Sequence, residues 1–511
     1  MSTKGTGGGK SLYADTAKLL EIIMAFHHEK DYYELLNILL TKMMEFTNAD
    51  GGTLYMVEDG MLHFRIMKTV SLGIAQGGRD KIDLPPIRLD ENNIGNISAY
   101  AAIKNEFVCI DDVYDSTAFI FVGPKEYDKM TGYRTGSMLV FPLTTSAGVD
   151  EPSEVIGVIQ LINAMDRETG LFKPFDDAPE EIDILRALAN ISANALANLI
   201  YAKEIRDLFY SFVRVMAKAI DERSPYTVNH TNHVARYCTD FTVYLGGRFP
   251  EGHAYHLDDN RREQLAMAAL LHDVGKIITP LEIMDKPDRL GTELDRIRLR
   301  FAVKKEQTEN SYLKREISEA RYVEAKEELA KALELVQTAN TAGFLDDGVI
   351  GQIEKLAAYT YTDEAGRSAP LLTPANLDAL TVRKGTLTET ERLIMQEHVS
   401  VTGRLLEQMK FNQAYREVPV WAKSHHEFLD GSGYPQNLKG SQIPTETCIL
   451  SIMDIYDALV ARDRPYKRAL PPEQALGILT EMADAGQLHK ELVHLFIESG
   501  AWQLAQSAEV L

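Results

Sequence analysis

Cysteine is scarce in this chain, with only three residues among 511. Cys109, Cys238 and Cys448 lie far apart in apolar surroundings, which is typical of free thiols in a reducing compartment and not of a disulfide framework. No apolar stretch reaches the ~18 residues of a membrane-spanning helix, and residues 1–10 carry no apolar segment of a secretory signal. We therefore expect a soluble, cytoplasmic protein with no membrane partner and a flexible N-terminus at residues 1–14.

Positive charge is also scarce, because 54 basic residues stand against 75 acidic ones and leave a formal net charge of −21. A surface of this sign repels polyanions, so we expect no nucleic acid polymer as a partner. Any nucleotide ligand must be held by local cations or metal ions. The hydrophobic fraction of 45% and charged fraction of 25% are ordinary for globular domains, and the length indicates two or three of them.

Residues 15–180 combine helical and strand patterns. Apolar residues recur at helical spacing as far as Thr47, and from Thr53 onward the spacing changes to strand-like alternation. Five predicted strands are separated by Gly, Pro and Asp: residues 52–57, 63–67, 107–110, 137–143 and 155–163. The pattern predicts an α+β domain with an antiparallel sheet and helices on one face.

Three segments of this region resemble a GAF domain: residues 94–112 (IGNISAYAAIKNEFVCIDD), 136–143 (GSMLVFPL) and 155–163 (VIGVIQLIN). The resemblance implies a sensory domain with an unknown small-molecule ligand. Members that bind cyclic nucleotides carry Asn-Lys, then Phe, then Asp-Glu. This chain offers Asn163, Phe175 and Glu180 but has Ala164 and Pro179 at the Lys and Asp positions. A ligand-binding domain and a dimerisation and spacing module both stay open.

Residues 181–208 predict a linker helix. Apolar and small residues follow alternating steps of three and four, as in a coiled-coil seam: Leu185, Leu188, Ser192, Ala195, Leu199 and Ala202. The helix can pair with a second copy or pack on the preceding sheet. A helix that joins two domains is a usual dimer axis, so we favour a homodimer.

Histidines in the second half of the chain form a particular arrangement with two aspartates. The residues are His230, His272, Asp273, His398, His425, His426 and Asp454. Imidazole nitrogens and carboxylate oxygens together suit a two-metal centre of iron or manganese, and the lack of clustered cysteines argues against structural zinc. Asp273 has two oxygens and can bridge two ions, which a histidine cannot do.

Two of these histidine segments also carry substrate-binding chemistry. In residues 266–277 (AMAALLHDVGKI), Lys276 follows His272 by four positions, so a helical turn would place a phosphate-neutralising cation on the histidine's face. In residues 421–435 (WAKSHHEFLDGSGYP), a histidine pair precedes a glycine-rich loop. Glycines at 431 and 433 permit positive φ and close backbone approach, so we expect this loop to face a ligand.

The third segment, residues 449–467 (ILSIMDIYDALVARDRPYK), places Asp454 and Asp457 three positions apart on one helical face. We expect Asp454 to ligate a metal and Asp457 to orient a histidine as a hydrogen-bond acceptor. Arg464 and Lys467 are two cations next to the predicted metal site in an acidic protein, which indicates phosphate binding.

The strings HDVGK, HHEFLDGSGYP and DALVARDRPYK resemble the signature segments of the HD-GYP phosphodiesterases, a subgroup of the HD-domain metallohydrolases. The resemblance implies an all-α helical bundle over residues 209–511 that hydrolyses cyclic di-GMP to linear pGpG, or further to GMP, regulated by the GAF domain. Three alternatives stay open: a catalytically silent cyclic di-GMP receptor, a nucleotide phosphohydrolase of the wider HD group, and a phosphodiesterase for a mixed-base cyclic dinucleotide.

Carried over position by position, the resemblance implies ligands and substrate contacts in this chain. The implied ligands of two divalent ions are His230, His272, Asp273, His398, His425, His426 and Asp454. The implied substrate contacts are Lys276, Gly433, Tyr434, Arg464 and Lys467, and Asp273 and Lys276 are the candidate catalytic residues.

Residues 288–384 interrupt the resemblance. Their stretch 301–340 is rich in Glu, Lys and Ala and predicts a long solvated helix or a helical hairpin. The insertion lies between implied ligands in the sequence, which is compatible with a gate over the site and equally with a peripheral elaboration.

Some HD-GYP members carry a glutamate four residues before the first histidine, which recruits a third metal, and this chain has Tyr226 there. Tyrosine is a poor substitute, so we expect two metal ions per chain and slow conversion of pGpG to GMP. Tyr226→Glu should add an oxygen ligand beside His230 and raise both metal content and GMP yield, measured by elemental analysis and product chromatography. Three ions in the unmodified protein would contradict this expectation.

Overall fold

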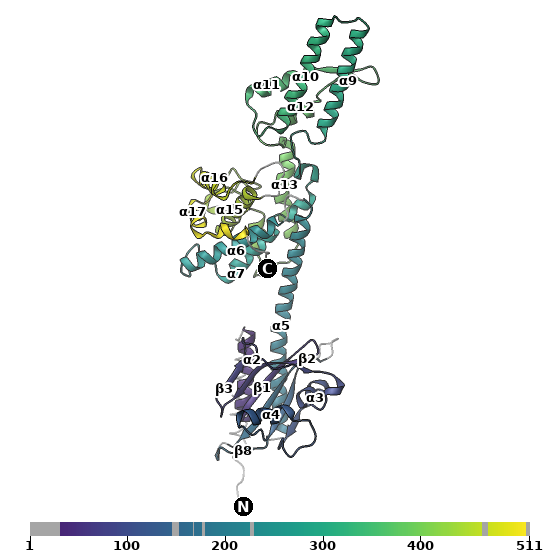
Figure 1. The fold of residues 1–511 in the computed structure, drawn as a ribbon. Helices are drawn as coiled ribbons and strands as arrows, with labels where there is room; N and C mark the ends of the chain where they lie inside the picture. Colours follow the sequence, from purple (N-terminus) through teal and green to yellow (C-terminus); the bar gives the residue numbers. More distant parts are fainter. Residues whose placement is uncertain are drawn as a thin grey trace, which may run out of the picture. The chain divides into compact units, whose positions relative to one another are not determined.

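The computed structural model describes residues 31–145, 153–166, 168–175, 179–224, 229–461 and 469–506. The chain divides into two compact units, residues 1–208 and 209–511, which have separate cores (Figure 1). None of the helices in the described ranges has the length and apolar character needed to cross a membrane. The predicted flexible N-terminus lies outside the described residues.

The first unit is built around an antiparallel sheet. Its strands are β1 (Ala49–Glu58), β2 (Met61–Thr69), β3 (Ile74–Gly77), β4 (Ile87–Arg88), β5 (Val108–Ile110), β6 (Met138–Thr144), β7 (Val155–Met165) and β8 (Phe172–Lys173). The order is β3-β2-β1-β7-β6-β5, with β4 beside β2 and β8 beside β7. The predicted α+β architecture and all five predicted strands are confirmed. The strands that the sequence pattern missed, β3, β4 and β8, have only two to four residues.

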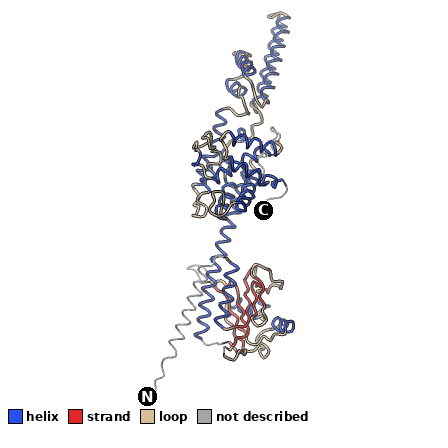
Figure 2. Tube along the Cα trace, turned by 90° about the vertical axis from the view of Figure 1, so that its left-hand side faces the viewer, coloured by secondary structure: helices blue, strands red, loops and turns tan. Residues whose placement is uncertain are grey.

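Helices cover both faces of this sheet, so the prediction of one covered face is wrong (Figure 2). The helices are α2 (Tyr32–Thr47), η1 (Glu91–Asn93), α3 (Ile97–Lys104), α4 (Val122–Thr131) and the first part of α5 (Pro179–Asp221). Leu36 of α2 and Leu188 of α5 share one core with the sheet, and Ile97 of α3 belongs to the core on the opposite face. Strand β6 is buried at six of seven positions, as expected for a strand covered on both faces.

The first part of α5 accounts for the coiled-coil pattern predicted over residues 181–208. Leu185, Leu188 and Ser192 are buried, with at most 2% of each side chain's residue surface exposed. Since the sheet core already occupies this face, the predicted seam is wrong over its first half. The alternative, a helix packed on its own sheet, holds there.

A mostly helical bundle forms the second unit, as predicted, but the insertion is not purely helical because it also contains a short two-stranded antiparallel sheet. Apart from the insertion and the last part of α5, its helices are α6 (His230–Arg248), α7 (Asp259–Leu271), η2 (Val274–Ile278), α8 (Leu281–Met284), α13 (Glu389–Leu406), α14 (Val418–Ala422), η4 (Gly440–Gln442), α15 (Thr445–Val460), α16 (Pro472–Asp484), α17 (Lys490–Ser499) and η5 (Ala501–Gln506). Apolar side chains of α6, α7, α15, α16 and α17 share one core. Thr388 and Glu391 form a capping box, which stabilises the start of α13.

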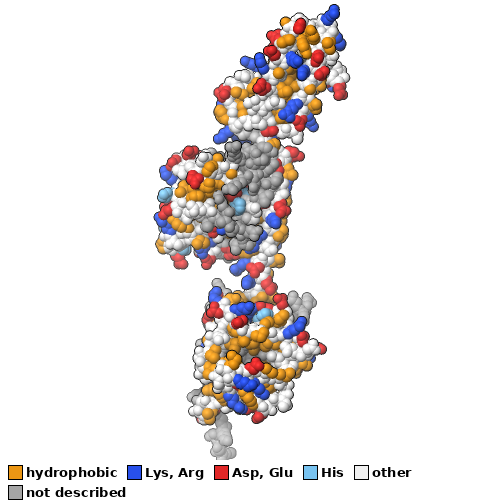
Figure 3. Space-filling view, viewed as in Figure 1, with side chains coloured by type: hydrophobic (Ala, Val, Ile, Leu, Met, Phe, Trp, Pro, Cys, Tyr) orange, Lys and Arg blue, Asp and Glu red, His pale blue; other side chains and the backbone are white. Residues whose placement is uncertain are grey.

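The insertion at residues 288–384 has a core of its own. Its elements are α9 (Glu293–Leu313), α10 (Glu319–Thr341), α11 (Asp347–Lys355), η3 (Leu356–Ala358), β9 (Thr360–Thr362), β10 (Ser368–Pro370) and α12 (Pro374–Leu380). Helices α9 and α10 pack together as a helical hairpin, one of the two predicted forms. The buried Arg289 donates to the carbonyls of Ala339 (2.8 Å) and Val382 (3.0 Å), which ties the start of the insertion to its end. Acidic and basic side chains are interspersed on its face in Figure 3.

The turn after α7 packs directly against α13 at Gly275. A Cβ atom on Gly275 would lie 1.9 Å from the carbonyl oxygen of His398 and 2.6 Å from the nitrogen of Thr402. The Thr402 hydroxyl accepts from the Gly275 N–H (2.9 Å) and donates to the carbonyl of His272 (3.0 Å). Helix α7 ends at Leu271, and Gly275 in the following turn permits the close contact that brings two histidine-bearing segments together.

Gly275→Ala should destabilise the second unit by ~1–3 kcal/mol, because the added methyl group forces α13 and the turn apart. It should also lower metal content by displacing His398, which elemental analysis and denaturant unfolding would measure together. Gly477→Ala on α16 is the control, since a Cβ there meets no atom within 4 Å. Equal unfolding midpoints for the two variants would contradict the packing argument.

Candidate metal centre

Seven side chains from separate elements of the bundle converge at one place. His230 begins α6, His272 and Asp273 follow α7, His398 lies in α13, His425 and His426 follow α14, and Asp454 lies in α15. Six of the seven are buried and His426 is half-buried. Three overlapping groups have potential ligand atoms within 4.8 Å of one another: His230, His272 and Asp454; His272, Asp273 and His425; and His398, His425 and His426.

Asp273 lies at the centre of this cluster, and its two oxygens face different histidines. Oδ2 lies 3.2 Å from Nε2 of His272 and 3.6 Å from Nε2 of His230. Oδ1 lies 3.3 Å from Nε2 of His398 and 4.0 Å from Nε2 of His425. One carboxylate thus stands between two histidine pairs, as a bridge between two cations requires.

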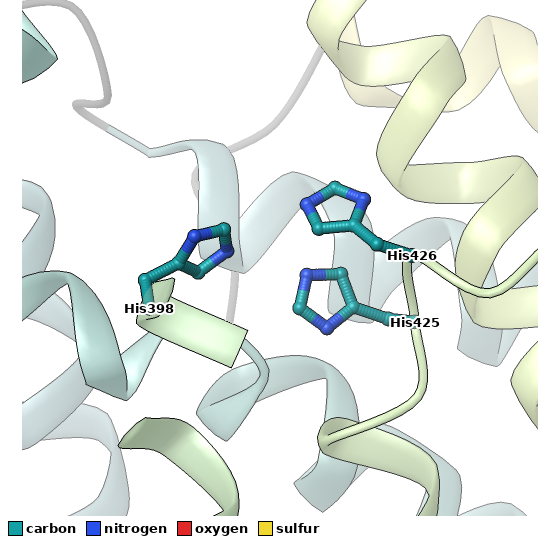
Figure 4. Close-up of side chains that lie close together, drawn as sticks. All are labelled: His398, His425 and His426. Carbon is teal, nitrogen blue, oxygen red and sulfur yellow. The ribbon is translucent and has the colours of Figure 1, made fainter. Parts of the chain in front are cut away.

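Asp454 lies close to three of the histidines, and its two oxygens face different rings. Its Oδ1 lies 3.2 Å from Nε2 of His230 and 3.7 Å from Nε2 of His272. Its Oδ2 lies 3.7 Å from Nδ1 of His426. Figure 4 shows the imidazole of His398 facing those of His425 and His426.

Backbone carbonyls orient three of the rings. The Nδ1–H groups of His272, His398 and His425 donate to the carbonyl three residues earlier, at 2.6, 2.5 and 2.6 Å. This tautomer leaves Nε2 with a free lone pair directed into the cluster. Among the described residues, these three Nε2 atoms and Oδ1 of Asp273 are buried without a hydrogen-bond partner. Buried polar atoms without partners are costly, and divalent cations would satisfy all four, so the donor set fits metal ions.

The electrostatics of the cluster also favour cations. Burial lowers the pKa of His425 well below its usual value and that of His426 to about 4, so both rings stay neutral at pH 7. Burial also opposes charge on His272, but Asp273 and Asp454 outweigh it and raise its pKa to about 9. Although burial raises the pKa of both carboxyls, neighbouring cationic groups and hydrogen bonds hold each well below its usual value. The ionised carboxylates therefore attract positive charge, whether protons or metal ions.

Asp457 lies directly behind His230. Its Oδ2 is 2.7 Å from Nδ1 of His230, which confirms the predicted contact between this carboxylate and a histidine. Its Oδ1 is 3.2 Å from Nδ1 of His233, a residue that the sequence reasoning missed. The His-x-x-His spacing on α6, which puts both rings on one face, was the available signal.

Lys276 contacts the cluster from the turn after α7. Its Nζ lies 2.5 Å from Oδ2 of Asp273. The guanidinium of Arg223 donates to the carbonyls of Lys276 and Thr279, the latter at 3.2 Å. Arg223 directly follows the last turn of α5, so the end of that helix holds the lysine-bearing turn. Its separation of 53 residues from Lys276 made this contact invisible in the sequence.

The glycine-rich loop after the histidine pair places Tyr434 beside His426, with ring centroids 4.9 Å apart. Gly431 has the predicted positive φ of 83°, but Gly433 does not. A Cβ on Gly433 would lie 2.4 Å from the nitrogen of Phe428, so this glycine is required by close packing of the loop on itself. Buried Glu427 accepts from two loop N–H groups, at 2.6 and 2.9 Å, and stabilises the same turn.

Three residues assigned from the sequence lie outside the described residues: Tyr226, Arg464 and Lys467. The seven cluster residues, Lys276 and Tyr434 are therefore the parts of the predicted site that the structure brings together.

Protein-family models agree with this division of the chain. A GAF domain model matches residues 31–196, and two HD domain models match residues 227–339 and 368–492. The chain thus joins a GAF domain to an HD domain whose histidines and aspartates form a cluster that can bind divalent metal ions.

Its relatives are named as phosphodiesterases of cyclic dinucleotides. A 3'3'-cGAMP-specific phosphodiesterase 1 from Vibrio cholerae is 22% identical over 289 residues, which cover 57% of this chain and 41% of the relative. A cyclic di-GMP phosphodiesterase from Thermotoga maritima is 34% identical over 122 residues, covering 24% of this chain and 32% of the relative. The chain therefore spans less than half the length of these curated relatives.

Among solved structures, the GAF domain of an Acinetobacter phosphoenolpyruvate-protein phosphotransferase is similar to 37% of this chain and 98% of that chain, with 14% identity and a TM-score of 0.27.

Asp457→Asn should lower metal affinity or activity about 10–100-fold, because the neutral amide weakens the hydrogen bond that orients His230. Metal titration and elemental analysis of the purified protein would measure the effect. Asp484→Asn, a matched change at an exposed position on α16, should leave both quantities unchanged. Full metal affinity in Asp457→Asn would show that His230 needs no orienting carboxylate.

Proposed function

We propose that this chain is a metal-dependent phosphodiesterase that hydrolyses cyclic di-GMP to linear pGpG. The observation that carries the proposal is Asp273, whose two oxygens face separate histidine pairs in a buried cluster. Unpaired Nε2 and Oδ1 atoms in that cluster support the binding of cations there. The names of the relatives indicate the substrate class.

The cluster divides into two donor sets with Asp273 between them. We assign His230, His272 and Asp454 to one ion and His398, His425 and His426 to the other. Such mixed nitrogen and oxygen donors suit iron or manganese. Two bound divalent ions would supply a hydroxide nucleophile from water at neutral pH and offset the charge of the phosphodiester.

The remaining roles belong to side chains around the cluster. Lys276 lies against Asp273 and is suited to stabilise negative charge that develops on the phosphate oxygens. Tyr434 offers an aromatic ring beside His426, which is suited to pack on a nucleotide base. We also assign Arg464 and Lys467 to substrate phosphate binding, on the resemblance alone, and Gly433 to the shape of the loop that carries Tyr434.

A mixed-base cyclic dinucleotide is the second candidate substrate. It is favoured by the relative named as specific for 3'3'-cGAMP, whose similarity extends over 57% of this chain. Both substrates present the same phosphodiester to the cluster and differ in one base.

We also propose that the GAF domain regulates the metal centre through helix α5. In this proposal the chain acts as a homodimer in the cytoplasm. Asp221, at the end of α5, accepts from the hydroxyl of Thr231 at 2.6 Å, one residue after His230. Arg223 holds the turn that carries Lys276. A ligand that binds the GAF domain and shifts α5 would therefore change the positions of groups on both sides of the cluster.

The test combines product analysis with metal analysis of anaerobically purified protein. The protein should convert cyclic di-GMP to pGpG, and Asp273→Ala should abolish turnover and remove metal, because both ions depend on this carboxylate. Asp295→Ala on α9, whose side chain is 81% exposed, is the control.

Each alternative has its own outcome. Faster turnover of 3'3'-cGAMP would select the second substrate, and hydrolysis of mononucleotides alone would indicate the wider HD group. Binding of cyclic di-GMP without turnover in fully metallated protein would indicate a receptor. Full turnover by Asp273→Ala would refute the site.

A further inference from the structure

A row of large apolar side chains is exposed along α5. They are Tyr201 (47% exposed), Ile205 (69%), Leu208 (71%), Phe212 (54%) and Val215 (64%). Their positions follow alternating steps of four and three residues. On a helix with 3.6 residues per turn, this spacing keeps all five on one face.

This face is distinct from the faces of α5 that pack within the chain. Ala189 and Leu196 are buried in the GAF core, and Val213 and Ala217 are buried further along the helix. The charged side chains in this stretch are exposed and lie off the apolar row: Lys203, Glu204, Arg206, Asp207 and Arg214. The exposed apolar face therefore contains no charged residue between positions 201 and 215.

We propose that this face is the seam of a parallel, in-register coiled coil with a second copy of the chain. The proposal deepens the homodimer assigned under the proposed function, and it replaces the seam predicted from the sequence, whose first half lies in the GAF core.

The heptad pattern indicates that this exposed face pairs with a second copy of the chain. The a positions are Ile191, Asn198, Ile205 and Phe212, and the d positions are Asn194, Tyr201, Leu208 and Val215. A β-branched residue at a with Leu at d, as in Ile205 and Leu208, favours a parallel pair of helices. Exposed Asn198 is a polar residue at an a position, which is the usual determinant of two-stranded, in-register pairing.

The exposed apolar row supplies more than half of the area that a standard interface buries on each partner. Each of the five exposed side chains can bury roughly 100 Å², about half the area of a large side chain. Together they supply on the order of 500 Å² per chain, against ~800 Å² per partner in a standard interface. Half-buried Phe209 and Met216 occupy the flanking e positions but pack against the bundle core of the same chain, so they are not counted in this area.

The first test is the oligomeric state of the full chain by analytical ultracentrifugation. The unmodified protein should sediment at twice the chain mass. Ile205→Asp with Leu208→Asp should weaken association at least 100-fold, with unchanged circular dichroism because both side chains are exposed in the isolated chain. Lys203→Asp with Arg206→Asp places the same aspartates off the seam and should leave the dimer intact.

The second test is orientation, by oxidative cross-linking. Ile205→Cys should form a disulfide-linked dimer, because parallel in-register pairing places the two copies of an a residue opposite each other, and a disulfide needs Cα atoms within about 7 Å. Lys203→Cys, on the outer face, and the unmodified chain with its three cysteines are the controls.

The outcomes distinguish a homodimer formed through this seam from a homodimer formed through another surface. A dimer that persists in the aspartate variant, or cross-linking through residue 203 in preference to 205, overturns the seam but leaves the homodimer in place. A monomeric unmodified protein overturns both, and neither result bears on whether the chain hydrolyses cyclic di-GMP.

Discussion

A buried carboxylate surrounded by histidines is the constraint on which the second unit depends. Asp273 is 4% exposed, so bulk solvent can do little to stabilise its charge and its ionised form is stabilised by cations on both sides. Elements far apart in the sequence supply the histidines, and each must be held with a ring nitrogen pointing inward. Backbone carbonyls within the same local segments do this for three rings, and Asp457 does it for His230. The close contact at Gly275 brings two of those elements within range of each other.

Helix α5 contributes residues to the cores of both units, because different parts of its surface make different contacts. One face packs in the GAF core, later residues pack in the helical bundle, and the residues just beyond its end bond to the turn that carries Lys276. Between residues 201 and 215 the helix also presents an exposed row of apolar side chains. Under the proposed regulation, a second copy on that row would pair with the same helix after which Arg223 bonds to the lysine turn.

The insertion at residues 288–384 is a long segment between residues of the metal centre. It has its own apolar core, separate from the core beneath the histidines, so its stability does not depend on that core. Arg289, at the start of the insertion, donates to the carbonyls of Ala339 in α10 and Val382 near the end, so the two ends are held together at the base. Lys286, before the insertion, pairs with Glu391 after it at 2.7 Å, and the same glutamate caps α13. These contacts favour a peripheral elaboration anchored at its base over a segment that forms the site.

Much of this could be predicted from local sequence. The five main strands and the role of Asp457 follow from periodicity and spacing, because strands alternate and residues three or four apart share a helical face. The histidine and aspartate donors follow from their residue types, and the helical bundle follows from the HD-GYP resemblance. Contacts between distant segments could not be predicted in this way. The sequence alone did not show that α3 covers the second face of the sheet, that Arg223 reaches Lys276, or which face of α5 is left exposed. Those features depend on which surfaces meet after folding, and a heptad spacing is the same whether its partner is the chain's own sheet or another helix. Only the tertiary structure distinguishes the two, because it shows which apolar face is already buried.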